Sequence, residues 1–254
     1  MVDSLRGFFD RIEASDRHLV VINRESPDPV RNMLDALLAD QSVSVSDVEA
    51  PDGETDVVAL VEDGEVLAQS PLEELMESVL LINSDLYKSG AIELKEVVLP
   101  DVLRGLDEVP FRLRGYPQSN KEKLLLIVVS RVVERIAAET AGGTLRASFQ
   151  RLSRLRDERG TYEVYRALGA RGVDVHVYGT GDLESPEELP LTVHTGSSYP
   201  YRRSWFVVFT PPDAESSDHA ALLAIEDEPN VWDGFWTFRP DLVREIESYI
   251  AANV

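Results

Sequence analysis

The stretch that decides the fold is residues 119–150, SNKEKLLLIVVSRVVERIAAETAGGTLRASFQ. Ser119 and Glu122 have the spacing of a capping box, in which each side chain bonds a free backbone N–H at the start of a helix. Six consecutive aliphatic residues follow at 124–129, and such a run could also be a strand. The capping spacing and the apolar residues that continue beyond the run favour a buried helix over about residues 120–140.

Three polar residues interrupt this helix. Ser130, Arg131 and Glu134 are three and four positions apart, so they share one side of it. If that side faces a cavity, Arg131 can hold an anionic ligand group through two parallel hydrogen bonds. The alternative is an exposed ion pair within the helix, which contributes only ~0.3–0.5 kcal/mol. The spacing alone leaves both interpretations open.

A strand is expected directly after the helix, at residues 145–149. It ends in Phe149, Gln150 and Arg151, and ligands bind outside the carboxyl ends of strands in open α/β sheets. These three residues are therefore candidates for ligand binding. The alternative is that they begin an ordinary surface loop.

The three tryptophans, Trp205, Trp232 and Trp236, fall within 32 residues near the end of the chain. Packing in the core of a sheet is the ordinary role for such residues. The sharper hypothesis is a wall for an aromatic or planar ligand, with Trp205 and Trp236 as its candidate residues.

Composition excludes several kinds of protein. The chain has 254 residues, 43% of them hydrophobic, so it can form a substantial core. It has no cysteine, and none of its four histidines has the spacing of a metal-binding motif. The longest aliphatic run is six residues, against the ~18 that a membrane span needs. We expect a cytoplasmic protein without a cofactor, a metal or catalytic residues.

Charge is unevenly distributed along the chain. The formal net charge is −21, with 46 acidic and 25 basic residues, of which only four are lysine. Such acidity suits a halophilic source, because molar salt shortens the Debye length to ~3 Å and screens self-repulsion. Residues 111–171 nevertheless hold thirteen bases and six acids. This basic island is either a solvated face or a face for an anion or a partner. Nucleic acid is not expected, because the acidic flanks would repel a phosphate backbone.

The first half predicts a small α/β unit. Its expected elements are helices at 4–15, 30–38 and 70–86 and strands at 18–23, 43–48, 57–61 and 66–68. The third of these helices has the clearest start, with Ser70 as the N-cap, Pro71 at the first position and Glu73 completing a capping box. Asp63-Gly64 predicts a tight hairpin turn.

The second half predicts a mixed sheet covered by helices. Its expected elements are strands at 145–149, 173–178, 203–210, 221–225 and 231–238 and helices at 101–106, 120–140, 162–168 and 240–250. The fold class is therefore α/β, with α+β as the alternative. Interruptions by proline and glycine place a domain boundary near residue 110, which gives domains 1–110 and 111–254. The alternative is one continuous domain.

Four segments of the second half resemble a known family. They are KEKLLLIVVSRVVE (121–134), ASFQRLSRLRDERGTYEVYRAL (147–168), RSWFVVFTPP (203–212) and GFWTFRPDLVREIESYI (234–250). They are similar to the DICT sensory domain, found in diguanylate cyclases and two-component signalling proteins, and the acidity suggests a haloarchaeal member. The resemblance implies a ligand- or signal-sensing module without catalytic residues. Residues 1–110 resemble no family, and no output module is recognisable.

Together these observations predict a non-catalytic sensory protein that couples a small-molecule or protein signal to a signalling partner through two conformations. One alternative is an enzyme that acts on an anionic small molecule. Another is a scaffold or dimerisation module, and a homodimer is compatible with the sequence. Neither nucleic acid nor a membrane is expected as a partner.

Overall fold

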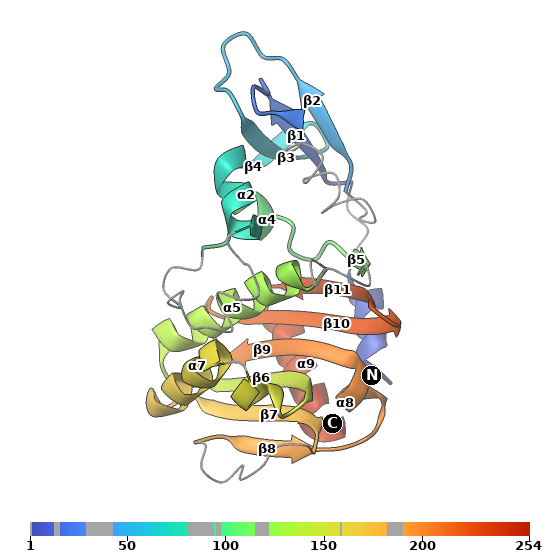
Figure 1. Cartoon of the computed structure of the whole chain (residues 1–254), viewed down its shortest axis with the longest axis vertical. Coiled ribbons are helices and arrows are strands. Elements are labelled where there is room, and N and C mark those ends of the chain that lie inside the picture. The colour runs from blue at the N-terminus through green and yellow to red at the C-terminus, as the bar shows by residue number, and fades with distance from the viewer. Residues whose placement is uncertain are drawn as a thin grey trace.

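The protein consists of a four-stranded and a seven-stranded sheet, stacked along the long axis of the molecule with helices between them (Figure 1). The computed structural model describes residues 2–12, 16–28, 43–80, 94, 98–114, 122–157, 159–181 and 190–254. Mixed sheets with covering helices confirm the α/β class expected from the sequence.

The smaller sheet has the strand order β2-β1-β3-β4. Its strands are β1 (His18–Ile22), β2 (Val45–Val48), β3 (Val57–Glu62) and β4 (Glu65–Pro71). β1 pairs parallel with β2 and antiparallel with β3. The β3–β4 hairpin turns at Asp63 and Gly64, whose φ angles of 52° and 81° are those of the Asp-Gly turn predicted from the sequence.

Helices α2 (Leu72–Leu80) and α4 (Asp101–Arg104) pack under this sheet. The helix start predicted at Ser70 is wrong. Ser70 and Pro71 belong to β4, and the Ser70 hydroxyl accepts a hydrogen bond from the backbone N–H of Val102 in α4 (3.3 Å) instead of capping α2. The serine therefore joins α4 to the sheet.

The larger sheet has the order β5-β11-β10-β9-β6-β7-β8. Its strands are β5 (Phe111–Arg114), β6 (Thr144–Arg151), β7 (Asp174–Thr180), β8 (Thr192–Thr195), β9 (Ser204–Thr210), β10 (Ala220–Glu228) and β11 (Val231–Thr237). β6, β7 and β8 run parallel, and the other neighbours pair antiparallel. The strands expected at 145–149, 173–178, 203–210, 221–225 and 231–238 are all present, whereas β5 and β8 were not expected.

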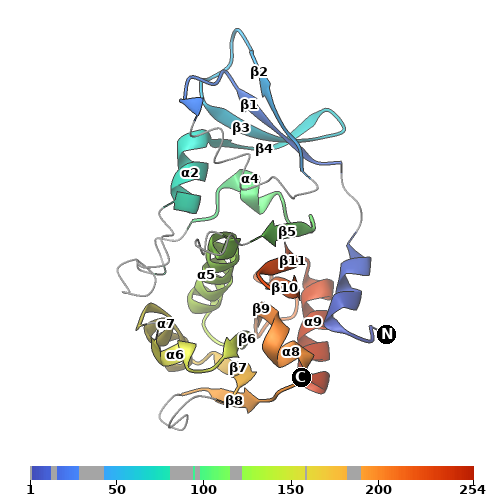
Figure 2. The same ribbon diagram turned by 45° about the vertical axis from the view of Figure 1, so that its right-hand side comes forward.

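Helices cover both faces of the larger sheet (Figure 2). One face carries α5 (Glu122–Thr140), α6 (Arg154–Asp157) and α7 (Arg159–Ala170), and the opposite face carries η1 (Leu5–Arg11) and α9 (Pro240–Asn253). The short helix α8 (Tyr199–Arg203), also unexpected, leads into β9. The N-terminal helix predicted at 4–15 is a seven-residue 3₁₀ helix. It packs on α9 through Phe8 and Tyr249, whose ring centroids are 5.6 Å apart.

Helix α5 lies between the two sheets and belongs to the hydrophobic core that both share. Residues 125–129 of its aliphatic run are buried or half-buried, because α2, α7 and the larger sheet all contact the helix. The helix ends as expected: Ala141, Gly142 and Gly143 all have positive φ. A Cβ atom on Gly143 would lie 2.4 Å from the carbonyl oxygen of Thr210, so only glycine fits where the chain enters β6.

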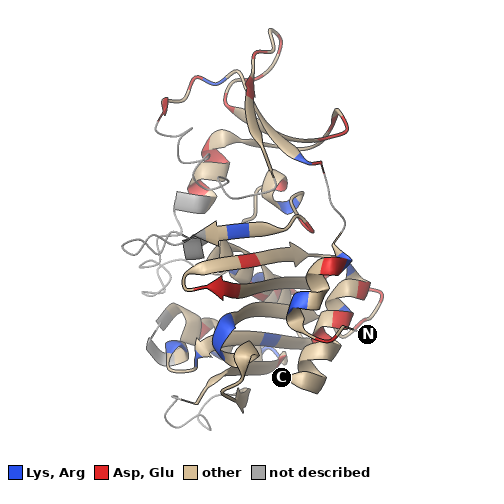
Figure 3. Cartoon of the chain, turned by 90° about the vertical axis from the view of Figure 1, so that its right-hand side faces the viewer, with Lys and Arg blue, Asp and Glu red and all other residues tan. Residues whose placement is uncertain are grey.

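The two units differ in charge. Acidic positions predominate on the smaller sheet and its helices, whereas most of the described basic positions lie on the larger sheet and its helices (Figure 3). The helix predicted at 30–38 and the capping residue Ser119 lie outside the described residues. The division at residue 110 stays a prediction.

Candidate functional site

The polar insertions of α5 form a buried ion pair. Arg131 donates from Nη1 to Glu134 Oε2 at 2.5 Å, and the two side chains are only 7% and 4% exposed. The second terminal nitrogen of Arg131, Nη2, donates to the Thr161 hydroxyl on α7 at 2.7 Å. Of the two interpretations that the spacing left open, the ion pair within the helix is present, but it is buried and not exposed, because α7 covers it. Arg131 thus joins α5 and α7, two of the helices on this face of the sheet.

Two aromatic residues complete this contact between α5 and α7. Tyr165 of α7 is fully buried, and burial raises the pKa of its hydroxyl well above the ordinary value, with the Glu134 carboxylate raising it further. Phe149 of β6 meets the Tyr165 ring edge-on, with 5.2 Å between the ring centroids. A charged pair, a hydroxyl and a phenol therefore share one dry interface, which we call the α5–α7 polar contact (Arg131, Glu134, Thr161 and Tyr165).

Ser130 faces the sheet instead of α7. Its hydroxyl donates to the Leu126 carbonyl at 2.7 Å and accepts a hydrogen bond from the Trp205 indole N–H at 3.0 Å. The serine therefore connects α5 to β9, whereas its neighbour Arg131 connects α5 to α7. Two adjacent residues of one helix thus fix it to two different elements.

Trp205 belongs to an aromatic cluster that lies against α5, formed by Phe111, Trp205, Trp232 and Trp236. The rings of Trp205 and Trp232 meet edge-on with centroids 6.1 Å apart, and Phe111 packs on Trp236 at 5.7 Å. The indole N–H groups of Trp232 and Trp236 are buried and have no hydrogen-bond partner in the part of the chain that the structure describes. Such donors suit an acceptor atom of a ligand or a water molecule.

A glycine makes room for this cluster. Gly234 of β11 is paired with Phe111 of β5 and with Ala224 of β10. A Cβ atom at this position would lie 2.3 Å from Cζ of Phe111. The Phe111 ring can therefore lie over β11, next to the edge of the sheet, only because position 234 has no side chain.

The carboxyl end of β6 forms a separate polar group. Gln150 has a φ of 50° at a register shift in the pairing of β6 with β7, so its side chain is redirected relative to the strand. It donates to the Ser204 carbonyl at 2.7 Å and accepts from Arg154 at 2.9 Å. Arg151, next to it, is exposed and paired with Thr180 of β7. These contacts fasten the ends of β6 and β7 to the start of β9.

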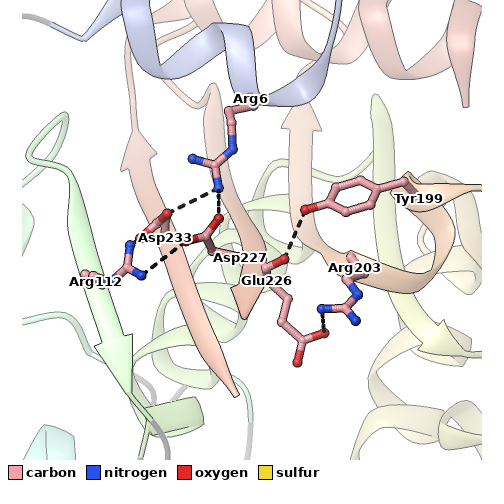
Figure 4. Close-up of polar contacts among 7 residues, drawn as sticks. All are labelled: Arg6, Arg112, Tyr199, Arg203, Glu226, Asp227 and Asp233. Atoms are coloured by element: carbon pink, nitrogen blue, oxygen red, sulfur yellow. Dashed lines mark hydrogen bonds and ion pairs between the residues drawn. The ribbon is translucent and has the colours of Figure 1, made fainter. Parts of the chain in front are cut away.

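At the same edge of the sheet, polar contacts connect α8 with β10 (Figure 4). Arg203 forms an ion pair with Glu226 at 3.6 Å, and the Tyr199 hydroxyl donates to the Glu226 carbonyl at 3.0 Å. Arginines 151, 154, 202 and 203 thus come from both sides of the β6–β9 pair. Acidic residues, Glu226 among them, lie at the same edge, so it carries charges of both signs.

The eight residues singled out from the sequence therefore occupy three places and do not form one site. Arg131, Glu134 and Phe149 lie at the α5–α7 polar contact, Ser130, Trp205 and Trp236 at the aromatic cluster, and Gln150 and Arg151 at the end of β6. The first two places touch the same helix, α5. The third lies at the edge of the sheet.

Residues 102–227 match a protein-family model, DICT, described as a sensory domain in diguanylate cyclases and two-component systems. This part of the chain is a DICT domain. The match confirms the resemblance for the segments at 121–134, 147–168 and 203–212, whereas the fourth, 234–250, lies beyond it. It assigns the matched residues to a sensory domain of signalling proteins. It begins in α4 and ends in β10, whereas β11 and α9 complete the same sheet and core beyond it. The DICT segment includes α5, the α5–α7 polar contact and the end of β6.

Other comparisons add no argument about function. The chain resembles the crystal structure of a polyphosphate kinase from Porphyromonas gingivalis with a TM-score of 0.36 and 9% identity. The alignment covers 97% of this chain and 47% of the kinase, so the chain spans about half of that protein's length. At this level of similarity the likeness supports no conclusion. No curated protein sequence matches the chain.

Sequence reasoning missed one polar group of the DICT domain, a histidine pair on β7 and β8. His176 Nε2 lies 3.1 Å from the Asp174 carboxylate, and His176 Nδ1 lies 2.9 Å from His194 Nε2. A carboxylate only accepts, so the Nε2 atom of His176 is the donor to Asp174, and one of the two histidines donates to the other. The histidines are eighteen positions apart, and only the pairing of β8 brings them together. No local spacing could have indicated this contact.

His194 is held in its neutral form. Its ring is stacked on Tyr178, with 4.3 Å between centroids and 6° between planes. Burial lowers the pKa of His194, and the neighbouring His176 and Arg146 lower it further. Among the described residues, no group of three or more histidine, aspartate or glutamate side chains is arranged to hold a metal ion. No described helix is long and apolar enough to cross a lipid bilayer.

Proposed function

We propose that this protein is a non-catalytic sensory module that couples the binding of a small molecule, or of a protein-borne signal, to a signalling partner. The observation that carries the proposal is the DICT match, which assigns residues 102–227 to a sensory domain. The described structure adds a helix, α5, that contacts α2 and the larger sheet, shares a hydrophobic core with the smaller sheet, and lies within the matched segment. A change on one side of α5 therefore has a physical route to the other.

The aromatic cluster is our candidate for the ligand-responsive part. Its indole N–H groups at Trp232 and Trp236 are unpaired within the described residues, and Ser130 connects the cluster to α5. A planar ligand with acceptor atoms would satisfy such donors and stack on the rings. Binding there would act on α5 directly, because Trp205 is hydrogen-bonded to it.

The α5–α7 polar contact would determine which positions α5 can adopt relative to α7. A buried ion pair costs desolvation free energy, and its hydrogen bonds have a narrow range of good geometry. A shift of α5 would therefore require Arg131 to exchange its bond to Thr161 for another partner. Gln150 and Arg151 would respond to the same shift through β6, which carries Phe149 beneath Tyr165.

A melting screen tests this proposal. The full chain is heated with each member of a metabolite library in buffers of low and of molar salt, and a ligand that binds the folded state raises the melting temperature. Because all three tryptophans belong to the aromatic cluster, their emission spectrum reports whether a hit binds there. The matched variants are Trp236→Phe, which removes an unpaired N–H, and Tyr199→Phe, which alters a distant exposed hydroxyl.

We expect at least one compound that raises the melting temperature, changes the tryptophan emission, and does so less in Trp236→Phe than in Tyr199→Phe. The absence of any stabilising compound would contradict the small-molecule form of the proposal. Turnover of a library compound would instead favour the alternative of an enzyme acting on an anionic small molecule.

A further inference from the structure

A pocket of about 640 Å³ lies between η1 and the edge of the larger sheet, and it shares one residue, Phe111, with the aromatic cluster. Its lining residues are Ser4, Arg6, Gly7, Phe9, Asp10, Pro110, Phe111, Arg112 and Asp233. The volume falls within the range of small-molecule sites. The lining combines an apolar wall with charged groups of both signs, and this combination limits what the pocket can bind.

Two arginines and two aspartates form a closed network at one side of this pocket (Figure 4). Arg112 donates to Asp233 at 2.8 Å and to Asp227 at 3.1 Å through its two terminal nitrogens. Arg6 reaches the same two carboxylates from η1 through a single nitrogen, Nη2, at 3.0 Å to Asp227 and 3.3 Å to Asp233. Both carboxylates thus bridge both guanidinium groups.

One cation of this network, Arg6, has hydrogen-bond donors that the network does not use. Within the described residues, Arg6 Nε and Nη1 have no partner, although Nη2 is held in place by two carboxylates. The guanidinium is therefore oriented before any ligand arrives. Nε and Nη1 point to different sides of the guanidinium, with Cδ between them, so each can donate a single charge-assisted hydrogen bond to an anionic group of a ligand.

The pocket also offers an unused anion. Asp10 lines it from η1, and its carboxylate is exposed and has no hydrogen-bond or ion-pair partner in the described part of the chain. The lining as a whole holds two cations, Arg6 and Arg112, and two anions, Asp10 and Asp233. A ligand with one net charge of either sign would therefore meet like charge. A ligand with both signs would meet a complementary group at each end.

Phe9, Pro110 and Phe111 supply the apolar wall. Phe9 is fixed by an edge-on contact with Phe235, with 5.1 Å between the ring centroids, and Phe111 by its packing on Trp236. An apolar or aromatic side chain of a ligand would be removed from water against these rings.

We propose that this pocket binds a small zwitterion, an α-amino acid with an apolar side chain, whose carboxylate pairs with Arg6 and whose ammonium group pairs with Asp10. The proposal does not depend on the sensory function or on the aromatic cluster as its ligand site. If both proposals hold, Phe111 provides the connection, because it lines the pocket on one side and packs on Trp236 at 5.7 Å on the other.

The test compares three related probes on the full chain by protein-observed NMR titration and calorimetry. A panel of apolar L-amino acids, including L-phenylalanine and L-leucine, is tested first. L-Phenylalanine is then compared with 3-phenylpropanoate, which lacks the ammonium group, and with 2-phenylethylamine, which lacks the carboxylate. Loss of one charge-assisted pair should weaken binding about tenfold for either truncated probe.

Three variants assign the ends of the ligand. Arg6→Gln and Asp10→Asn should each weaken amino-acid binding about tenfold. Asp10→Asn should leave the affinity for 3-phenylpropanoate unchanged or higher, because it removes only the partner of the ammonium group. Arg11→Gln is the control: it removes an exposed pair between η1 and Glu245 of α9 (3.0 Å) without touching the pocket. Asp10 has no described side-chain contact to lose, so Asp10→Asn remains informative even if Arg6→Gln loosens η1.

Saturable binding of an amino acid with these losses supports the proposal. It is overturned if no member of the panel binds the wild-type chain, if 3-phenylpropanoate binds as tightly as L-phenylalanine, or if Arg11→Gln weakens binding as much as Asp10→Asn. Failure here leaves compounds found through the tryptophan emission unaffected, so the two proposals fail separately.

Discussion

Breaking the buried Arg131–Glu134 pair of α5 should lower the unfolding free energy far more than breaking an exposed ion pair on a helix would. In Arg131→Met, the Glu134 carboxylate stays 4% exposed and loses the guanidinium 2.5 Å away. Removing one partner of a buried ion pair typically costs about 3–5 kcal/mol of unfolding free energy, because the remaining charge is buried without compensation. We expect a loss in that range, together with loss of the bond that joins α5 to Thr161.

Replacing both partners should restore most of this loss. In Arg131→Met/Glu134→Leu, apolar side chains fill the interface, and such replacements of buried pairs are often neutral or stabilising. The matched control is Arg166→Met on α7. Its pair with Glu163 has the same spacing of three positions and a 2.8 Å separation, but the side chains are 59% and 48% exposed. The control should leave stability unchanged within error.

Urea denaturation followed by far-ultraviolet circular dichroism gives the unfolding free energy of all four proteins, with salt held constant because ionic strength alters exposed pairs. The reasoning is refuted if Arg131→Met and Arg166→Met cost the same. It is also refuted if the double variant is as unstable as Arg131→Met, because the buried charge would then not be the source of the loss.

Three further perturbations follow from the same contacts. Ser130→Ala leaves the Trp205 N–H without its acceptor and should cost about 1–3 kcal/mol, with a shift in tryptophan emission that Ser130→Thr largely avoids. Gly143→Ala should lower the melting temperature strongly, because the φ of Gly143 is 77° and the added Cβ would lie 2.4 Å from a carbonyl oxygen. Gly64→Ala should lower it less, because the φ is similar, 81°, but the added Cβ has no atom within 4 Å. The lowered pKa of His194 means that the unfolded chain binds its proton more readily. The contribution of His194 to stability is therefore fully present above pH 6.5 and is lost as the pH falls below 6.5. In a series of melting curves at decreasing pH, the melting temperature of His194→Gln should fall less than that of the wild type.

Helix α5 was predictable because its signals are local. The capping spacing, the aliphatic run and the glycines at its end all lie within the helix or next to it, and the structure places it at Glu122–Thr140. The pairing of Arg131 with Glu134 follows from helical geometry alone. Its burial does not, because it depends on Thr161 and Tyr165, which reach α5 from another helix. Sequence spacing identifies the partner within a helix and does not identify what covers it.

The missed elements are short and depend on distant partners. β5 is four residues long, and it is a strand because it pairs with β11 about 120 positions later. β8 is also four residues long and pairs only with β7. The error at Ser70 has a related cause. Its hydroxyl accepts a hydrogen bond from the backbone N–H of Val102 in α4, and not from the first turn of α2 as predicted. Ser130, Arg131 and Glu134 are polar residues in a buried helix, as their position in the sequence suggests. The distribution of the eight candidate residues over three places depends on the tertiary fold, and their role in ligand binding stays a prediction.

Amide hydrogen exchange measures whether α5 responds to a compound bound at the aromatic cluster. Amide exchange of the full chain is followed by mass spectrometry with and without a saturating compound from the melting screen, and peptides from α5, α2 and β1 are compared. If α5 transmits binding between the two sheets, exchange should slow in α5 and also change in α2 or β1, which lie outside the DICT segment. The account is contradicted if a compound bound at the aromatic cluster slows exchange only in β9 and β11 and leaves α5 and the smaller sheet unchanged.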